Sequence, residues 1–135
     1  MKTNTTRICL LVDDDEDDRE IFCLALADAD PSVKCIQAKD GLEALNLLKD
    51  RSFVPDYIFL DLNMPLMNGK ECLEEIRKQR HLNEVPVIIF STSSSEKDIL
   101  ETKNLGASAF IKKPPLTSTL SKNLLEVFND DHRGR

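Results

Sequence analysis

Long hydrophobic runs are missing from this 135-residue chain. No apolar stretch approaches the roughly 20 residues that a membrane-spanning helix needs. The N-terminal residues MKTNTTR also lack the apolar core of a secretory signal peptide. We therefore expect a chain that does not enter a membrane and that works in the cytoplasm.

Clusters of basic residues are missing as well. The chain has a formal net charge of −6, and its lysines and arginines are scattered. Proteins that bind nucleic acids gather lysine and arginine on one surface to neutralise phosphates. Binding to nucleic acid is therefore not an expected function.

Closely spaced pairs of cysteines are missing too. Cys9, Cys23, Cys35 and Cys72 are widely spaced, form no C-x-x-C pair and lie in apolar segments. Disulfide frameworks and zinc sites usually show closer spacings, so we expect reduced thiols in the core.

The composition favours one domain with a substantial core. Hydrophobic residues make up 41% of the chain, which has only 4 glycines and 6 prolines. This length suits a single domain and is short for two. We expect a domain over residues 1–135, with a core at about 6–128, a frayed tail at 129–135 and no output domain.

Short apolar stretches alternate with helical patterns five times along the chain. The predicted strands are 8–12, 33–38, 57–60, 87–90 and 109–111. The apolar faces of the predicted helices contain Ile21, Phe22, Ala25 and Leu26; Leu42, Leu45 and Leu48; Cys72, Leu73 and Ile76; Ile99 and Leu100; and Leu116, Leu120, Leu124, Val127 and Phe128. Strands that alternate with helices predict a parallel sheet with right-handed crossovers. The first, third and fourth strands are apolar on both faces, so we place them in the centre.

Polar residues lie within two positions of the ends of four of these strands. Asp13 and Asp14 follow the first strand, Asp61 the third, Ser91 the fourth and Lys113 the fifth. The carboxyl ends of parallel strands meet at one edge of a sheet, where α/β proteins bind their ligands. We expect these side chains to converge there.

The remaining acids of the run DDDEDD have other expected roles. Asp15 and Glu16 lie where the first helix begins, and its dipole favours negative charge there. Asp17 and Asp18 are expected to be solvated. Asp15 can also pair with Arg19, four residues further along the helix.

The converging carboxylates predict a metal site. Two carboxylates about 4 Å apart repel by roughly 4 kcal/mol at an effective dielectric constant of about 20. Their oxygen atoms suit a hard divalent cation, Mg²⁺ or Mn²⁺. A metal beside a carboxylate, a hydroxyl and a lysine fits phosphoryl transfer, in which an aspartate can be the nucleophile. Asp61 is the best candidate, because the turn LNMPLMNG after it leaves room for a phosphoryl group.

Four segments together resemble the response-regulator receiver domain, the CheY-like phosphoacceptor of two-component signalling. They are ICLLVDD, YIFLDLNMPLMNG, VPVIIFSTSS and GASAFIKKPP, and the resemblance covers essentially the whole chain. It implies a flavodoxin-like doubly wound sheet of five parallel strands in the order 2-1-3-4-5, with helices on both faces.

The resemblance also implies roles for the residues around the metal. Asp61 corresponds to the phosphorylated aspartate, and Asp14 to a direct Mg²⁺ ligand. Asp13 corresponds to a ligand that acts mainly through water. The backbone carbonyl of Asn63 corresponds to the last protein ligand.

Further roles concern the phosphoryl group and the conformational switch. Ser91 and Lys113 correspond to residues that bond phosphoryl oxygens, and Phe110 to an aromatic residue that moves inward on activation. Thr92 stands where alanine is frequent in the family and narrows access to the phosphoryl group. Ser93, like Asn63, occupies a position that tunes hydrolysis of the aspartyl phosphate.

The segment after the fifth strand departs from the family pattern. Pro115 replaces an aromatic residue that is frequent after the Lys-Pro pair. The resemblance also implies a cis peptide bond between Lys113 and Pro114, which an X-Pro amide forms at modest cost.

The resemblance implies a signalling domain rather than an enzyme. The phosphoryl donor is then a phosphohistidine of a histidine kinase or of a phosphotransfer protein. The output passes to a protein partner through the face formed by the helix at about 95–104, the strand at 109–111 and the last helix. His81 and His132 lie in polar surroundings and are not expected to donate phosphate.

Two alternatives stay open at the level of sequence. The first is a pseudo-receiver that binds partners without taking phosphate. The second is an aspartyl-phosphate phosphatase of the haloacid dehalogenase type. Such phosphatases need an aspartate where this chain has Asn63, and the chain leaves no room for a substrate cap.

Overall fold

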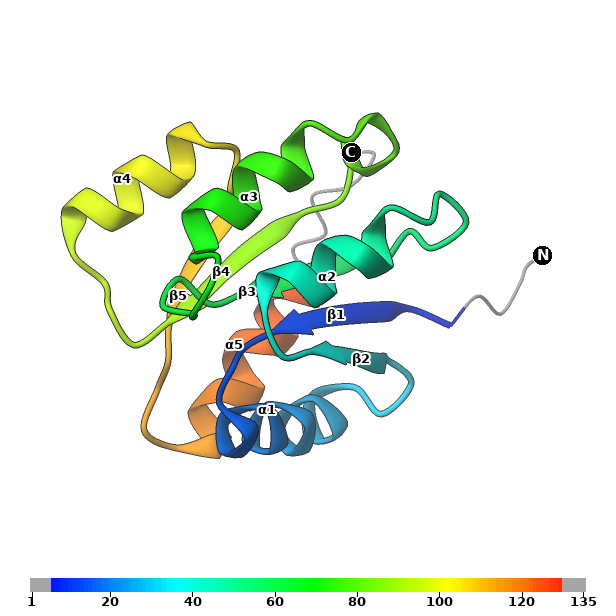
Figure 1. Cartoon of the computed structure of the whole chain (residues 1–135). Helices are drawn as coiled ribbons and strands as arrows, with labels where there is room; N and C mark the ends of the chain where they lie inside the picture. The colour runs from blue at the N-terminus through cyan, green and yellow to red at the C-terminus, as the bar shows by residue number, and fades with distance from the viewer. Residues whose placement is uncertain (1–5, 130–135) are drawn as a thin grey trace.

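The computed structural model describes residues 6–129, whose five strands form one parallel sheet (Figure 1). The strands are β1 (Ile8–Val12), β2 (Lys34–Ala38), β3 (Tyr57–Leu60), β4 (Val87–Ser91) and β5 (Ala109–Lys112). Their order is β2-β1-β3-β4-β5, and every neighbouring pair is parallel. The predicted flavodoxin-like fold and strand order are confirmed.

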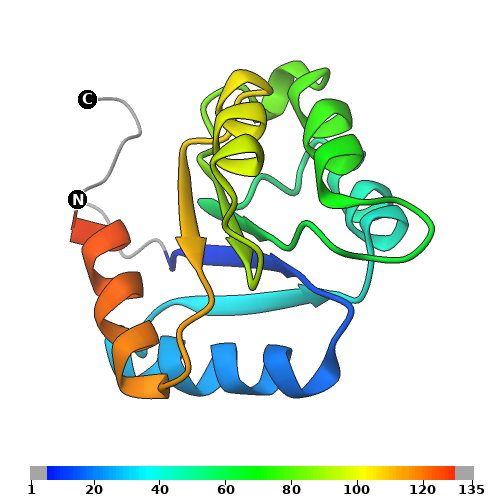
Figure 2. The same cartoon turned by 90° about the vertical axis from the view of Figure 1, so that its left-hand side faces the viewer.

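Helices cover both faces of the sheet. They are α1 (Glu16–Ala29), α2 (Gly41–Leu48), α3 (Gly69–Arg77), α4 (Glu96–Asn104) and α5 (Thr117–Asn129), with a short 3₁₀ turn, η1 (Arg80–Leu82), after α3. The helices α1 and α5 lie on one face, and α2, α3 and α4 lie on the other (Figures 1 and 2). The sheet therefore separates two hydrophobic cores.

The central strands are buried on both sides, as their continuous apolar sequences predict. Leu10, Ile58 and Ile89 face the core under α2 and α3. The next residues along β1 and β3, Leu11 and Phe59, face the core under α1 and α5. The edge strands β2 and β5 both include exposed or half-buried residues.

Side chains cap the first turns of four helices. Asp15 accepts hydrogen bonds at the start of α1, Asp40 at α2, Asn68 at α3 and Ser95 at α4. Asn68 and Glu71 form a reciprocal capping box. Each such cap stabilises its helix by about 1 kcal/mol. The caps fix where each helix begins, close to the carboxyl end of the preceding strand.

Five of the residues that we placed on apolar helix faces are exposed: Ile21, Leu42, Ile99, Leu100 and Leu116. Leu42 is 51% exposed, because the buried face of α2 consists of Gly41, Ala44 and Leu48. Leu116 is 61% exposed, since it precedes α5, which begins at Thr117. The periodicity predicted the helices but misplaced these residues.

The four cysteines are free thiols, as expected, but Cys23 and Cys35 are half-buried rather than in the core. Cys9 and Cys72 are buried, and burial raises the pKa of each to about 12. Among residues 6–129, no helix combines the length and hydrophobicity that crossing a membrane requires. Of the tail predicted to fray, Asn129 ends α5, and 130–135 lie outside the described residues.

Candidate functional site

Polar side chains converge at the carboxyl ends of β1, β3, β4 and β5. Asp13, Asp61 and Ser91 are buried there. One carboxylate oxygen from each of Asp13, Asp14 and Asp61 lies within 4.8 Å of the other two. The structure thus brings together the acids that the sequence predicted at this edge.

Backbone hydrogen bonds fix the positions of these residues. The N–H of Asp13 donates to Ala38 at 3.1 Å, and the N–H of Asp61 donates to Val12 at 3.0 Å. The N–H of Lys113 donates to Ser91 at 2.8 Å. These bonds extend the strand ladders by one residue, so the register of the sheet places the side chains.

Lys113 lies among three carboxylates. Its ammonium nitrogen is 2.8 Å from Asp13 Oδ2, 2.9 Å from Asp18 Oδ2 and 3.4 Å from Asp61 Oδ2. It also lies 5.3 Å from the centre of the Phe90 ring, within the range of a cation–π contact. The predicted convergence of Lys113 with the acids is present.

Asp18 is a part of this site that the sequence did not reveal. We expected a solvated side chain, and this expectation is wrong, because Asp18 pairs with Lys113. The first turn of α1 carries its carboxylate toward the end of β5. No local pattern signals this contact, since the two residues lie 95 positions apart.

The electrostatics favour a cation. Burial raises the pKa of Asp13 and of Asp61, although Lys113 opposes the shift at both carboxylates. For Lys113 burial lowers the pKa, but hydrogen bonds to Asp13 and Asp18 more than offset this effect, and the pKa is raised. The Lys113 ammonium contacts three carboxylates, and the exposed Asp14 adds a fourth, so negative charge is in excess at this site. The donor set fits a divalent metal ion, which prefers such oxygen ligands.

Side-chain carboxylates of the acidic run accept hydrogen bonds from backbone N–H groups of the same run. Asp13 Oδ1 accepts from the N–H of Asp15 at 3.0 Å, and Asp15 Oδ1 accepts from the N–H of Asp17 at 2.9 Å. The predicted pairing of Asp15 with Arg19 is wrong. Arg19 donates instead to the carbonyl of Asp13 at 2.8 Å and to the side chain of Gln37 at 3.1 Å. A carboxylate that caps a helix is already committed to backbone N–H groups.

The loop between β3 and α3 turns back onto Asp61. The N–H of Gly69 donates to Leu62 at 2.8 Å, and the N–H of Asn63 approaches Asp61 Oδ1 at 3.4 Å. A Cβ atom on Gly69 would lie 2.2 Å from the carbonyl oxygen of Asp61. Leu66, at the exposed tip of the loop, has a φ of 70°. The start of α3 is therefore packed directly against the backbone of the central acid.

The hydroxyl of Ser91 is bonded within its own loop. Its Oγ accepts from the N–H of Ser93 at 3.3 Å. The Ser93 hydroxyl donates to Asp98 Oδ2 at 3.0 Å. Thr92, between the two serines, is exposed.

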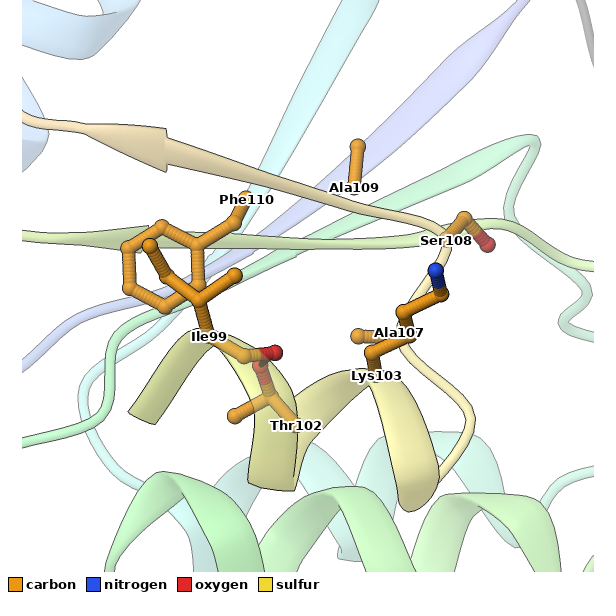
Figure 3. Close-up of a pocket in the computed structure, with 7 residues that line it drawn as sticks. All are labelled: Ile99, Thr102, Lys103, Ala107, Ser108, Ala109 and Phe110. Carbon is orange, nitrogen blue, oxygen red and sulfur yellow. Dashed lines mark hydrogen bonds between the residues drawn. The ribbon is translucent and has the colours of Figure 1, made fainter. Parts of the chain in front are cut away.

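Phe110 lies on the side of β5 that faces α4, beside a cavity of about 250 Å³. Figure 3 shows its ring next to the side chain of Ile99. Residues of α4 and β5 line this cavity: Ile99, Thr102, Lys103, Ala107, Ser108, Ala109 and Phe110. The ring is half-buried, and its strand position pairs with Ile89 of β4.

The peptide bond between Lys113 and Pro114 is trans, so the expected cis bond is wrong. The trans form of an X-Pro amide is favoured by about 0.5–1 kcal/mol unless the surroundings require cis. Here Lys113 reaches Asp13, Asp18 and Asp61 with the trans bond. Its surroundings therefore do not require the cis form.

Comparison with known proteins agrees with this geometry. The family model of the response regulator receiver domain matches residues 9–125. The response regulator Rcp1 of Synechocystis sp. is 30% identical over 132 residues, which cover 94% of this chain and 85% of Rcp1. The chemotaxis protein CheY-3 of Vibrio cholerae is 35% identical over 92 residues, 68% of this chain and 69% of CheY-3.

Solved structures show the same likeness. The phosphorylated cyanobacterial phytochrome response regulator RcpA is 30% identical, with a TM-score of 0.85 and 94% of each chain covered. The Mn²⁺-bound form of Rcp1 is 28% identical, with a TM-score of 0.78, over 90% of this chain and 91% of Rcp1. The chain belongs to the response-regulator receiver domain family of two-component signalling.

Proposed function

We propose that this chain is a cytoplasmic phosphoacceptor that takes a phosphoryl group onto Asp61 and passes the signal to a protein partner. The observation that carries the proposal is the cluster of Asp13, Asp14 and Asp61 with the Lys113 ammonium among them. The donor is a phosphohistidine on a histidine kinase or on a phosphotransfer protein. The membership of the receiver family supports this assignment.

The proposed reaction forms one bond and breaks another. A carboxylate oxygen of Asp61 attacks the phosphorus, and the bond between phosphorus and the donor's imidazole nitrogen breaks. The electron pair of that bond stays on the imidazole, which returns to its neutral form by taking up a proton. Asp61 must be ionised to attack, and Lys113 favours this form because its charge opposes the effect of burial on the pKa of Asp61.

We propose that Mg²⁺, or Mn²⁺, is the metal of this site. Asp14, Asp61 and the backbone carbonyl of Asn63 would hold it directly, and Asp13 would act through water. When bound, the metal neutralises negative charge that develops on the phosphoryl oxygens. The closely spaced carboxylate oxygens of this chain support the assignment, as does the Mn²⁺-bound form of its relative Rcp1.

Ser91 and Lys113 are proposed to bond the phosphoryl oxygens. In the free protein Lys113 lies within reach of Asp61, and the Ser91 hydroxyl is bonded to Ser93. We assign Thr92, Ser93 and Asn63 to tuning access and hydrolysis at the phosphorylated Asp61. Neither Ser93 nor Asn63 carries a charge that would orient an attacking water molecule.

The proposed output surface is the face of α4, β5 and α5. Ile99 and Leu100 on α4 are 40% and 60% exposed, and Phe110 of β5 borders the adjacent cavity. We assign Phe110 to the switch, because the free space beside its ring allows it to change position. A partner that recognises this face would distinguish the two positions of the ring.

The test is phosphorylation of the purified chain with acetyl phosphate and Mg²⁺. Mass spectrometry should detect one added phosphoryl group on wild type and none on Asp61→Asn. Beryllofluoride with Mg²⁺ should shift the NMR signals of Ser91 and Phe110 in wild type only. An unchanged wild type would contradict the proposal and favour the pseudo-receiver, and turnover of many phosphoesters per chain would favour a phosphatase.

A further inference from the structure

A network of charged side chains joins α3 to α4 beside the proposed phosphorylation site. Lys70, in the first turn of α3, lies 2.7 Å from Asp98 Oδ1 of α4 and also pairs with Glu101, one turn further along α4. These side chains are partly exposed. One lysine thus binds two successive turns of the neighbouring helix.

The network continues from α4 to the hydroxyl of Ser91. Asp98 accepts a hydrogen bond from Lys70 with one oxygen and from the Ser93 hydroxyl, at 3.0 Å, with the other. The N–H of Ser93 donates to Ser91 Oγ at 3.3 Å. Hydrogen bonds to Lys70 and Ser93 also lower the pKa of Asp98, so its carboxylate stays ionised.

The other end of the network is anchored on Asp61. Lys70 directly follows Gly69, whose missing Cβ lets α3 pack against the Asp61 carbonyl. The capping box of Asn68 and Glu71 fixes this first turn. A cavity of about 130 Å³ lies between the two sides, lined by Leu62, Asn63, Asn68, Lys70 and Asp98. The network therefore ties the loop after β3 to the loop after β4, across the edge of the site.

Hydrophobic packing holds α4 weakly. Within the part of the chain that the structure describes, Thr102 is the buried residue of α4, whereas α3 buries Gly69, Cys72, Leu73 and Ile76. The cavity beside Phe110 lies under α4 as well. The ion pairs of Lys70 therefore add to the few buried contacts that hold this helix in position.

We propose that Lys70 is a positioning residue that holds α4 and the Ser91–Ser93 loop in the phosphate-free arrangement. The inference rests on the proposed function. An interaction that stabilises the free arrangement more than the bound one opposes ligand binding by that difference. Breaking the pairs of Lys70 therefore favours occupation of Asp61 by a phosphoryl group. Partly exposed ion pairs of this kind predict a change of about two- to fivefold.

The experiment measures the affinity of the full chain for beryllofluoride at saturating Mg²⁺, followed by the NMR signals near Asp61. Lys70→Met should bind about two- to fivefold more tightly than wild type. Lys70→Arg retains a cation that reaches both acids and should stay near wild type. Lys78→Met is the matched control, because Lys78, which directly follows α3, pairs with Glu75 of α3 at 2.8 Å.

Hydrogen exchange gives a readout that does not depend on the ligand. Without beryllofluoride, amides of α4 should exchange faster in Lys70→Met than in Lys78→Met. Glu101→Gln, which removes one pair from the α4 side, should change affinity in the same direction by a smaller factor. This second variant keeps the test decisive if Lys70→Met folds poorly.

The outcomes separate this inference from the function on which it rests. Tight binding by wild type, with Lys70→Met and Glu101→Gln equal to Lys78→Met or weaker, would overturn the role of Lys70 and leave the proposed function standing. No binding by wild type would overturn both. Tighter binding by Lys70→Met together with slower hydrogen exchange in α4 would also overturn the role of Lys70, because the proposed role requires that α4 becomes less restrained when Lys70 is replaced.

Discussion

The position of Asp61 at the centre of the site is electrostatically unfavourable for its ionised carboxylate. Asp61 is 6% exposed, and burial raises the pKa of its carboxyl group although the nearby Lys113 opposes this shift. A raised pKa means that the folded chain binds this proton more tightly than the unfolded chain does. Ionised Asp61 therefore destabilises the metal-free fold at neutral pH.

Replacing this carboxylate by an amide should stabilise the metal-free protein. In EDTA at pH 7, we expect Asp61→Asn to raise the free energy of unfolding, because the amide removes the buried charge that the raised pKa of Asp61 disfavours in the fold. The difference should disappear as the pH falls through the raised pKa of Asp61, because the wild-type carboxyl group is then neutral as well. Urea unfolding of both proteins between pH 7 and pH 4 measures this. A variant that is less stable than wild type at pH 7 would contradict it.

Asp18 and Asp17 are adjacent carboxylates with different surroundings. Asp18 bonds Lys113 at 2.9 Å, whereas Asp17 is exposed in the first turn of α1. We expect Asp18→Asn to lower the free energy of unfolding by about 0.5 kcal/mol more than Asp17→Asn, a small effect because the Asp18 side chain is 34% exposed. Chemical unfolding in EDTA compares the two variants. Equal losses would show that the contact with Lys113 contributes nothing measurable.

Residues that directly follow a strand could be predicted from the sequence, and others could not. Asp13, Asp61 and Lys113 were placed correctly, because the strand before each one is a short apolar run and a parallel sheet aligns the strand ends. Asp18 was missed, because its contact depends on how α1 sits against the end of β5. The trans bond before Pro114 was missed because sequence does not fix the isomer.

Glycine begins two helices, α2 and α3, and the start of α3 has less free space. A Cβ on Gly69 would meet the Asp61 carbonyl oxygen at 2.2 Å and Leu62 Cα at 2.6 Å, and both are backbone atoms. Gly41 also begins a helix, α2, but its Cβ would meet the flexible side chain of Met67 at 3.1 Å. The same substitution should therefore lower the free energy of unfolding more at Gly69 than at Gly41.

We expect Gly69→Ala to destabilise the fold by about 2–3 kcal/mol, since relieving the overlap requires backbone movement. Gly41→Ala should stay within about 1 kcal/mol of wild type, because the Met67 side chain can move and alanine favours the helix. Thermal unfolding measures both. Similar melting temperatures for the two variants would show that the backbone of the loop after β3 can move away from the added methyl group at little cost in stability.

The helices themselves followed from their apolar periodicity, but the contacts between them did not. At the start of α4, Ser95 accepts a hydrogen bond from the N–H of Asp98. The pairs of Lys70 with Asp98 and Glu101 join residues 28 and 31 positions apart. Such contacts depend on the distance between two helices on the same face of the sheet, and no local pattern encodes that distance.

At the scale of the whole molecule, the charged residues of the site lie at the carboxyl ends of the strands, and the two hydrophobic cores lie on the two faces of the sheet. The strand order places β1 and β3 side by side, so Asp13 and Asp61 meet without any helix between them. This arrangement follows from the apolar central strands, which must lie in the middle of a parallel sheet. The stability of the fold is consequently linked to the charge state of that edge.

A ligand that binds only the folded edge should stabilise the entire chain. Mg²⁺ at about ten times its dissociation constant adds about 1.4 kcal/mol to the free energy of unfolding, which raises the melting temperature by a few degrees. Asp14→Asn removes one of the three clustered carboxylates and should reduce this rise to less than half. Asp17→Asn changes the net charge by the same amount outside that cluster and should leave the rise unchanged. Thermal unfolding of the three proteins in EDTA and in Mg²⁺ distinguishes a specific site from general screening, because screening would respond equally to both substitutions.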